Sequence, residues 1–142
     1  MRGELQAGEA LVPAGSLPAG CRIARVLLVE DSMLIALDAE DALIACGVGE
    51  VIIAGNVVAA LAVIDESLPD FAVLDYNLGE ETSEAVARAL THAGVPYCFA
   101  TGYGDALERV QACPPYGVLT KPYSQAELSR VLARVEADRA GI

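Results

Sequence analysis

The stretch Phe71-Ala72-Val73-Leu74-Asp75-Tyr76-Asn77-Leu78 carries four uncharged residues that lead directly into a carboxylate. Phe71 and Val73 favour a strand, and a short apolar run between Pro69 and a following glycine is typical of a buried strand. Asp75 would then lie where this strand leaves the sheet, at the edge where open α/β sheets bind their ligands. A carboxylate there costs free energy unless a partner compensates its charge. The rest of the sequence must supply that partner.

Length and composition indicate one globular domain. The chain has 142 residues, of which 54% are hydrophobic and 20% charged, which excludes a disordered chain. No apolar stretch is long enough to span a bilayer, so we expect no membrane association and a cytoplasmic location. The net charge of -11 argues against binding to nucleic acid. With His92 as the single histidine and no CxxC pair, a zinc site is not expected, and free thiols are the simplest interpretation of Cys21, Cys46, Cys98 and Cys113.

The two ends of the chain are expected to differ from its middle. Residues 1–24 contain repeated Gly, Ala and Pro without a period, and they lack the continuous apolar segment of a signal peptide. We interpret them as a flexible leader whose role the sequence leaves open. The domain is expected over residues 25–137, and residues 138–142 are expected to fray.

Strand and helix patterns alternate five times between these ends. Strands are expected at Arg25–Val29, Val51–Ala54, Phe71–Asp75, Pro96–Thr101 and Gly117–Lys121. Helices are expected after Ser32 up to Gly47, at Val57–Asp65, Glu84–Thr91 and Asp105–Ala112, and after the capping box formed by Ser124 and Glu127. The first helix is expected to be amphipathic, and its apolar face is expected to contain Ile35, Leu37, Ala39, Ala42, Leu43 and Cys46. This alternation predicts an α/β fold, a doubly wound five-stranded parallel sheet with the flavodoxin-like order 2-1-3-4-5.

In that order, polar side chains meet at the carboxyl ends of four neighbouring strands. They are Glu30 and Asp31, then Asp75, then Thr101, then Lys121. Clustered carboxylates repel one another and favour a divalent cation, and hard oxygen ligands suit Mg²⁺ better than zinc. Lys121 offers a compact positive charge for a phosphoryl oxygen, Thr101 offers a hydroxyl, and Gly102 leaves its backbone open to the same group. The set predicts a site that holds a phosphoryl group on Asp75.

With these residues in view, the chain from 25 to 137 resembles the receiver domain of two-component response regulators. The matching positions are the acidic pair Glu30-Asp31, the phosphoacceptor Asp75, the metal-binding backbone carbonyl of Asn77, the switch hydroxyl of Thr101 and the signature Lys121-Pro122. The resemblance implies Mg²⁺-dependent transfer of a phosphoryl group to Asp75 from a sensor histidine kinase or a histidine phosphotransfer protein. It implies that Asp31 binds the metal directly and that Glu30 acts mostly through water.

A finer resemblance concerns one subgroup of receivers. The run Phe99-Ala100-Thr101-Gly102-Tyr103-Gly104 is similar to the Phe-Ala-Thr-Gly motif of receivers that are often single-domain and often paired with HWE or HisKA2 sensor kinases. The run Asn77-Leu78-Gly79-Glu80 fits the same subgroup.

The sequence departs from the family at one position. Receivers ordinarily carry Tyr or Phe three residues before the conserved lysine, but here that residue is Val118, and Tyr116 lies too early in the strand. Tyr103 and Tyr123 are candidate substitutes, and packing or a partner surface is the alternative for both. We expect the segment 102–112 to respond to phosphorylation, and the partner face to include Tyr103, Val118 and Tyr123, with the helix from Asp105 and the last helix.

Three classes of function follow. The leading hypothesis is a stand-alone receiver that is not an enzyme and signals through protein contacts, as a phosphate sink, a relay or an allosteric binder. A phosphohydrolase with Asp75 as nucleophile would need an acid/base carboxylate close by, and Asn77 cannot transfer a proton in that role. A receiver that is never phosphorylated and only binds partners is the remaining alternative. The sequence does not identify the kinase, the pathway or the oligomeric state.

Overall fold

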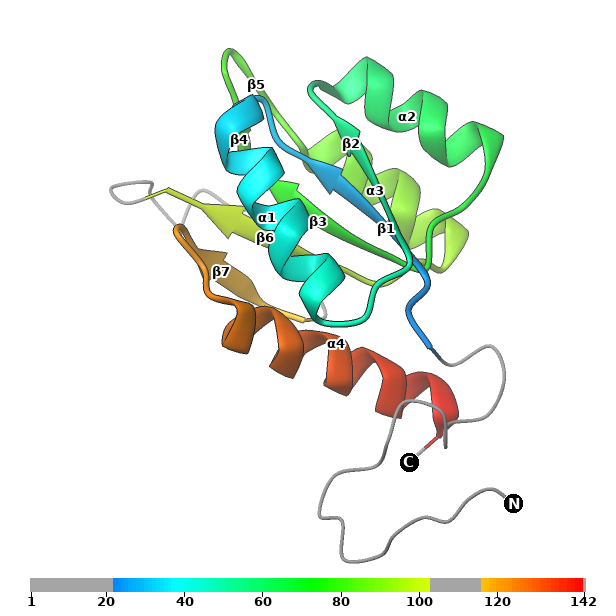
Figure 1. Cartoon of the computed structure of the whole chain (residues 1–142). Coiled ribbons are helices and arrows are strands. Elements are labelled where there is room, and N and C mark those ends of the chain that lie inside the picture. The colour runs from blue at the N-terminus through cyan, green and yellow to red at the C-terminus, as the bar shows by residue number, and fades with distance from the viewer. Residues whose placement is uncertain (1–21, 103–115, 142) are drawn as a thin grey trace, which may run out of the picture.

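The computed structural model describes residues 22–102 and 116–141. Five parallel strands form one sheet with helices on both of its faces (Figure 1). The strands are β1 (Arg25–Val29), β2 (Glu50–Ala54), β3 (Phe71–Asp75), β6 (Tyr97–Thr101) and β7 (Val118–Thr120). Their spatial order, β2-β1-β3-β6-β7, is the order 2-1-3-4-5 expected from the sequence. The doubly wound, flavodoxin-like fold is therefore confirmed.

The described helices form two layers. They are α1 (Met33–Ala45), α2 (Val57–Glu66), α3 (Glu84–Ala93) and α4 (Gln125–Ala140). Helices α1 and α4 cover one face of the sheet, and α2 and α3 cover the other, each pair with its own apolar cluster (Figure 1). None of the helices in the described ranges is long and apolar enough to cross a membrane. The expected helix Asp105–Ala112 lies outside the described residues, as do Tyr103 and the leader up to residue 21.

Helix α1 differs from its predicted amphipathic form. The Ser32 hydroxyl caps its first turn, accepting a hydrogen bond from the Ile35 N–H at 3.4 Å. The buried residues are Ala36, Ala39 and Leu43, whose spacing of three and four places them on one face. Two of them are alanines, and apart from Leu43 the long apolar side chains of the helix are exposed, as in Met33, Leu34 and Ile44. The prediction that Ile35 and Leu37 are core residues is wrong, because these side chains are 39% and 47% exposed.

A short ribbon follows β3 and was not predicted. Strands β4 (Asn77–Leu78) and β5 (Glu81–Thr82) pair antiparallel, where the sequence indicated only a polar turn. The chain reverses at Gly79, whose φ of +76° is a left-handed conformation that glycine adopts without strain. The ribbon lies directly after Asp75 and therefore borders the candidate site.

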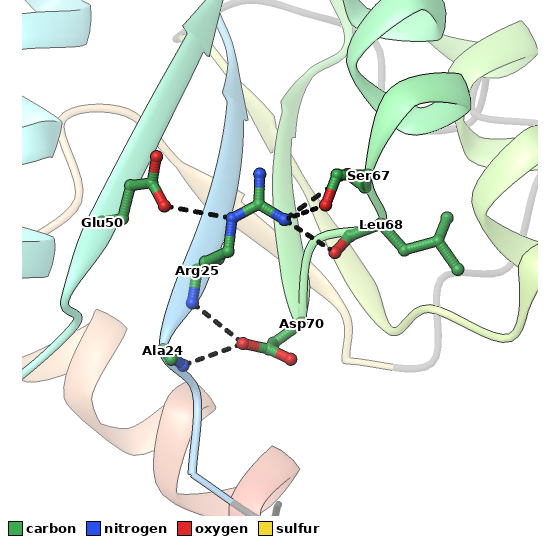
Figure 2. Close-up of polar contacts among 6 residues, drawn as sticks. All are labelled: Ala24, Arg25, Glu50, Ser67, Leu68 and Asp70. Carbon is green, nitrogen blue, oxygen red and sulfur yellow. Dashed lines mark hydrogen bonds and ion pairs between the residues drawn. The ribbon is translucent and has the colours of Figure 1, made fainter.

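Polar contacts fasten the start of β1 at the amino edge of the sheet. The Asp70 carboxylate accepts hydrogen bonds from the backbone N–H groups of Ala24 and Arg25 at 3.0 and 2.9 Å (Figure 2). The Arg25 guanidinium binds Glu50 at 3.1 Å, and it donates to the Ser67 hydroxyl and to a backbone carbonyl beyond it. These contacts join β1 to the first residue of β2 and to the segment before β3.

The expected limits of the domain move outward at both ends. Ile23 is buried, and its N–H donates to the Glu136 carboxylate of α4 at 3.0 Å, so the ordered chain begins before residue 25. The prediction that residues from 138 onward fray is wrong for 138–140, because α4 continues to Ala140. Asp138 accepts a hydrogen bond from Tyr116, and Arg139 forms an ion pair with Asp70. These contacts hold the last turn of the helix.

Candidate functional site

Three carboxylates meet at the carboxyl edge of the sheet, as the sequence predicted. Oxygen atoms of Glu30, Asp31 and Asp75 all lie within 4.8 Å of one another, because β1 and β3 are neighbouring parallel strands that both end at this edge. Glu30 and Asp75 are buried, whereas Asp31 is exposed. Glu30 is fixed in place by the Ser32 N–H, which donates to its Oε2 at 3.1 Å. The cluster is therefore open to solvent on one side.

Lys121 is the partner that compensates the buried carboxylates. Its Nζ lies 3.1 Å from Asp75 Oδ2 and 3.2 Å from Glu30 Oε1. The backbone N–H of Lys121 donates to the Thr101 carbonyl at 2.7 Å, which ties the end of β7 to β6. From the sequence, this amine was expected to face a phosphoryl oxygen. In the structure, the amine bridges the carboxylates of Asp75 and Glu30.

The electrostatics of the site reflect this crowding. Burial raises the pKa of Asp75 to about 7, and the neighbouring Glu30 charge acts in the same direction against the opposing effect of Lys121. For Lys121, burial disfavours the charged amine, but the carboxylates of Asp75 and Glu30 outweigh it and raise the pKa. One lysine therefore does not fully compensate the carboxylates around it, and the site retains a demand for positive charge.

The remaining predicted site residues lie around this centre. Thr101 ends β6 beside β3, where Asp75 pairs in register with Ala100, and only 2% of Thr101 is exposed. Gly102 follows at intermediate burial, and Asn77 is exposed in the ribbon directly beyond Asp75. Tyr103, the last residue predicted near this edge, lies outside the described residues.

The donor set fits a hard divalent cation. The clustered carboxylate oxygens, one of them from an exposed side chain that leaves room for water, match the preference of Mg²⁺ for oxygen ligands and retained hydration. The cluster contains no sulfur or imidazole ligand, which a zinc site would favour. Glu30, Asp31 and Asp75 can therefore bind a metal of this class.

The aromatic residues near β7 have separate surroundings. Val118 is 36% exposed, and Tyr123 is half-buried against the α1 and α4 cluster, where burial raises the pKa of its hydroxyl. Tyr116 packs edge-on against Phe71, with ring centroids 6.3 Å apart, and donates to Asp138 at 2.5 Å. Since Phe71 begins β3 and Asp75 ends it, Tyr116 lies at the opposite edge of the sheet from the acidic cluster.

An apolar surface beside the site was missed by the sequence reasoning. Met33 and Leu34 at the start of α1 are 61% and 83% exposed, and Leu37 one turn later is also exposed. A groove of about 970 Å³ lies between this part of α1 and the segment after β7, with Leu34, Lys121 and Tyr123 among its walls. The available signal was the continuous apolar run 33–37 at the start of α1, which is longer than one buried face of a helix can hold.

Several solved structures are similar to this chain. No protein-family model and no curated protein matches the chain. SdrG from Sphingomonas melonis Fr1 is 35% identical over 80% of this chain and 96% of SdrG, with a TM-score of 0.67. A response regulator receiver domain protein from Clostridium thermocellum has a TM-score of 0.72 at 20% identity, over 82% of this chain and 97% of its own. The receiver domain of the response regulator PhyR from Erythrobacter litoralis has a TM-score of 0.66 at 23% identity, over 80% and 90%.

The fold and the site define a doubly wound α/β domain with an acidic cluster and a lysine at its carboxyl edge. The matched structures have this fold over nearly their whole length. This chain belongs to the receiver-domain family of response regulators, the proteins of two-component signalling.

Proposed function

We propose that this receiver accepts a phosphoryl group on Asp75 from a phosphohistidine, in a reaction that requires Mg²⁺. The observation that carries the proposal is the position of Asp75, buried between Glu30 and the Lys121 amine and within reach of the exposed Asp31. It is a nucleophile with a cation beside it and an opening to solvent on one side. The chain is proposed to act as a phosphoacceptor and not as a turnover enzyme.

The chemistry assigns a role to each described residue. An Asp75 carboxylate oxygen attacks phosphorus, the bond from phosphorus to the donor imidazole breaks, and the imidazole nitrogen keeps the electron pair and takes a proton from water. The Lys121 amine, 3.1 Å from Asp75, and the Thr101 hydroxyl donate to oxygens of the transferred group. A bound Mg²⁺ would be held by Asp31, Asp75 and the Asn77 carbonyl, with Glu30 nearby. It would supply positive charge to compensate the negative charge of the transferred phosphoryl group.

The donor is proposed to dock on the apolar start of α1. Leu34 and Leu37 line the groove that Lys121 also lines, and Met33, next to Leu34 in sequence, is exposed as well. A helix carrying a phosphohistidine and an apolar face would bury this surface while its imidazole reaches Asp75. The resemblance of Phe99-Ala100-Thr101-Gly102 to the Phe-Ala-Thr-Gly motif supports a sensor kinase of the HWE or HisKA2 type as that donor.

The first experiment is intact mass measurement after incubation with acetyl phosphate and Mg²⁺. We expect one phosphoryl adduct that requires Mg²⁺, is absent in Asp75→Asn and persists in Asp70→Asn, which changes a carboxylate at the opposite edge. If small donors give no adduct, phosphorylated sensor kinases replace them. Failure with both kinds of donor would favour the binding-only receiver, and release of inorganic phosphate in repeated turnovers would favour the phosphohydrolase.

A second experiment separates docking from chemistry. Leu34→Asp is expected to reduce transfer from a phosphorylated kinase at least tenfold while leaving the reaction with acetyl phosphate unchanged, because a small donor needs no docking surface. Val58→Asp on α2 is the matched control, since Val58 is 78% exposed and Leu34 is 83% exposed. Equal loss in both variants would contradict docking at α1. A competition assay with a second receiver then distinguishes a sink from a relay or an allosteric binder.

A further inference from the structure

Tyr76 lies between two members of the proposed metal site. Asp75 precedes it as the phosphoacceptor, and Asn77, whose backbone carbonyl is proposed to bind the metal, follows it. The position of that carbonyl depends on the backbone of the ribbon, which is only two residues long on each strand and separate from the main sheet. Such a short ribbon is marginal by itself, so contacts from outside must hold it in place.

Tyr76 makes such contacts on three sides. Its backbone N–H donates to the Ala100 carbonyl of β6 at 2.8 Å, and its carbonyl accepts from the Ser83 N–H at 3.0 Å, which closes the ribbon. Its hydroxyl donates to Glu84 Oε2 in the first turn of α3 at 2.7 Å. Its ring packs edge-on against Phe99, with centroids 5.4 Å apart and planes at 86°. The side chain packs in the apolar cluster of α2 and α3 and not in the acidic cluster of Glu30, Asp31 and Asp75.

A second contact fastens the far strand of the ribbon. Glu81 of β5 accepts a hydrogen bond from the Val57 N–H at the start of α2, with a distance of 3.2 Å. This carboxylate is exposed, so its bond competes with water and holds the ribbon less firmly than the partly buried bond from Tyr76 to Glu84. The Tyr76 hydroxyl is therefore the stronger of the two side-chain anchors.

We propose that Tyr76 and Glu84 are a positioning pair for the metal site, which holds the backbone from Asp75 to Asn77 in the conformation that binds Mg²⁺. The inference rests on the proposed function, since it concerns the same site. With the segment already ordered, a cation does not have to supply the free energy of ordering it. Residues that orient metal ligands through hydrogen bonds typically change metal affinity by a factor of ten or more.

The test compares two tyrosines that pack against the same phenylalanine. Tyr76→Phe removes the hydroxyl and keeps the ring on Phe99. Tyr97→Phe is the matched control, because Tyr97 is also buried and also packs edge-on against Phe99, at 5.7 Å, but begins β6 at the opposite edge of the sheet. Amide chemical shifts are followed by NMR during titration with MgCl₂, and unfolding in urea is measured for each variant.

We expect Tyr76→Phe to weaken Mg²⁺ binding roughly tenfold, and Tyr97→Phe to leave it unchanged. Glu84→Ala should match Tyr76→Phe, and Glu84→Gln, which keeps an acceptor oxygen, should restore most of the affinity. If both Tyr76→Phe and Glu84→Ala bind Mg²⁺ with wild-type affinity, this inference is overturned and the proposed metal site is not. A wild-type chain whose shifts do not respond to Mg²⁺ overturns the proposed metal site and this inference with it.

Discussion

The two edges of the sheet both gather charged side chains, but they balance them differently. At the amino edge, Arg25 forms an ion pair with Glu50, and Asp70 accepts hydrogen bonds from two backbone N–H groups (Figure 2). Arg139 forms a second ion pair there, with Asp70. At the carboxyl edge of the described chain, three carboxylates lie around the single amine of Lys121. The first arrangement satisfies its charges within the protein and fastens elements together. The second leaves negative charge that a ligand can compensate, and this difference separates a structural network from a binding site.

The largest effect is expected when the amine is removed from the carboxyl edge. Lys121→Met leaves Asp75 and Glu30 buried without a cation, so we expect a loss of about 3 kcal/mol in the free energy of unfolding at pH 8 without divalent cations. At pH 5 the loss should be smaller, because protonation of Asp75 removes its repulsion with Glu30. Urea unfolding at both pH values measures it. Arg139→Met, which removes a partly exposed cation from the amino edge, should cost about 0.5 kcal/mol or less. Equal losses in the two variants would remove the distinction between the edges.

Removal of the Asp75 charge should change stability in the opposite direction. The pKa of Asp75 is raised to about 7 from an ordinary value of 3.8, so the folded state disfavours its ionised form. The contribution of this group to stability is present below pH 3.8 and is lost as the pH rises through about 7. We therefore expect Asp75→Asn to stabilise the metal-free protein by about 2 kcal/mol at pH 8 and by little at pH 4. Unfolding in urea with EDTA measures this gain, and a variant that is less stable at pH 8 would contradict it.

Replacement of a carboxylate at the amino edge should lower the stability of the protein. Asp70→Ala removes the acceptor for the N–H groups of Ala24 and Arg25 and the partner of Arg139, so we expect a loss of about 1–2 kcal/mol. The variant should bind Mg²⁺ as the wild type does, since it lies at the other edge. Thermal unfolding with and without MgCl₂ tests both statements. A stabilising effect like that expected for Asp75→Asn would refute the assignment of the amino edge as structural.

The smallest effect is expected for the exposed ion pair at the amino edge. Glu50 is 58% exposed in its pair with Arg25, whose guanidinium keeps its bonds to Ser67 and Leu68 when Glu50 changes. Glu50→Gln should therefore alter the free energy of unfolding by about 0.5 kcal/mol or less, and raising the salt concentration should reduce the difference further. A loss in the free energy of unfolding as large as that expected for Asp70→Ala would show that this ion pair is a main source of stability at the amino edge.

The strand ends were predictable from sequence, and the contacts between them were not. Apolar runs that end in Glu30, Asp75 and Thr101 specify both the strands and the edge where these side chains meet, because parallel strands share a direction. The bridge from Lys121 to Asp75 and Glu30 depends on where a long side chain turns, which no local pattern encodes.

Two errors have a shared physical cause. Ile35 and Leu37 were predicted on the apolar face because apolar residues are usually buried, but Ala36, Ala39 and Leu43 occupy the face toward the sheet. The end of α4 was expected to fray because the last residues of a domain often do, but Asp138 and Arg139 have partners distant in sequence. In both cases tertiary contacts decided what the local pattern left ambiguous. The ribbon at Asn77 was missed because strands of two residues leave no periodic signal.

The ends of the described chain have a practical consequence for handling the protein. Ile23 contacts Glu136, and Asp70 contacts both Ala24 and Arg139, so Arg22 and Gly141 leave the fold on the amino side of the sheet (Figure 1). Attachment through either end, to a sensor chip, a fluorophore or a fused second protein, leaves the carboxylates and the start of α1 facing away from the support. Partner binding can then be measured on immobilised receiver in either orientation.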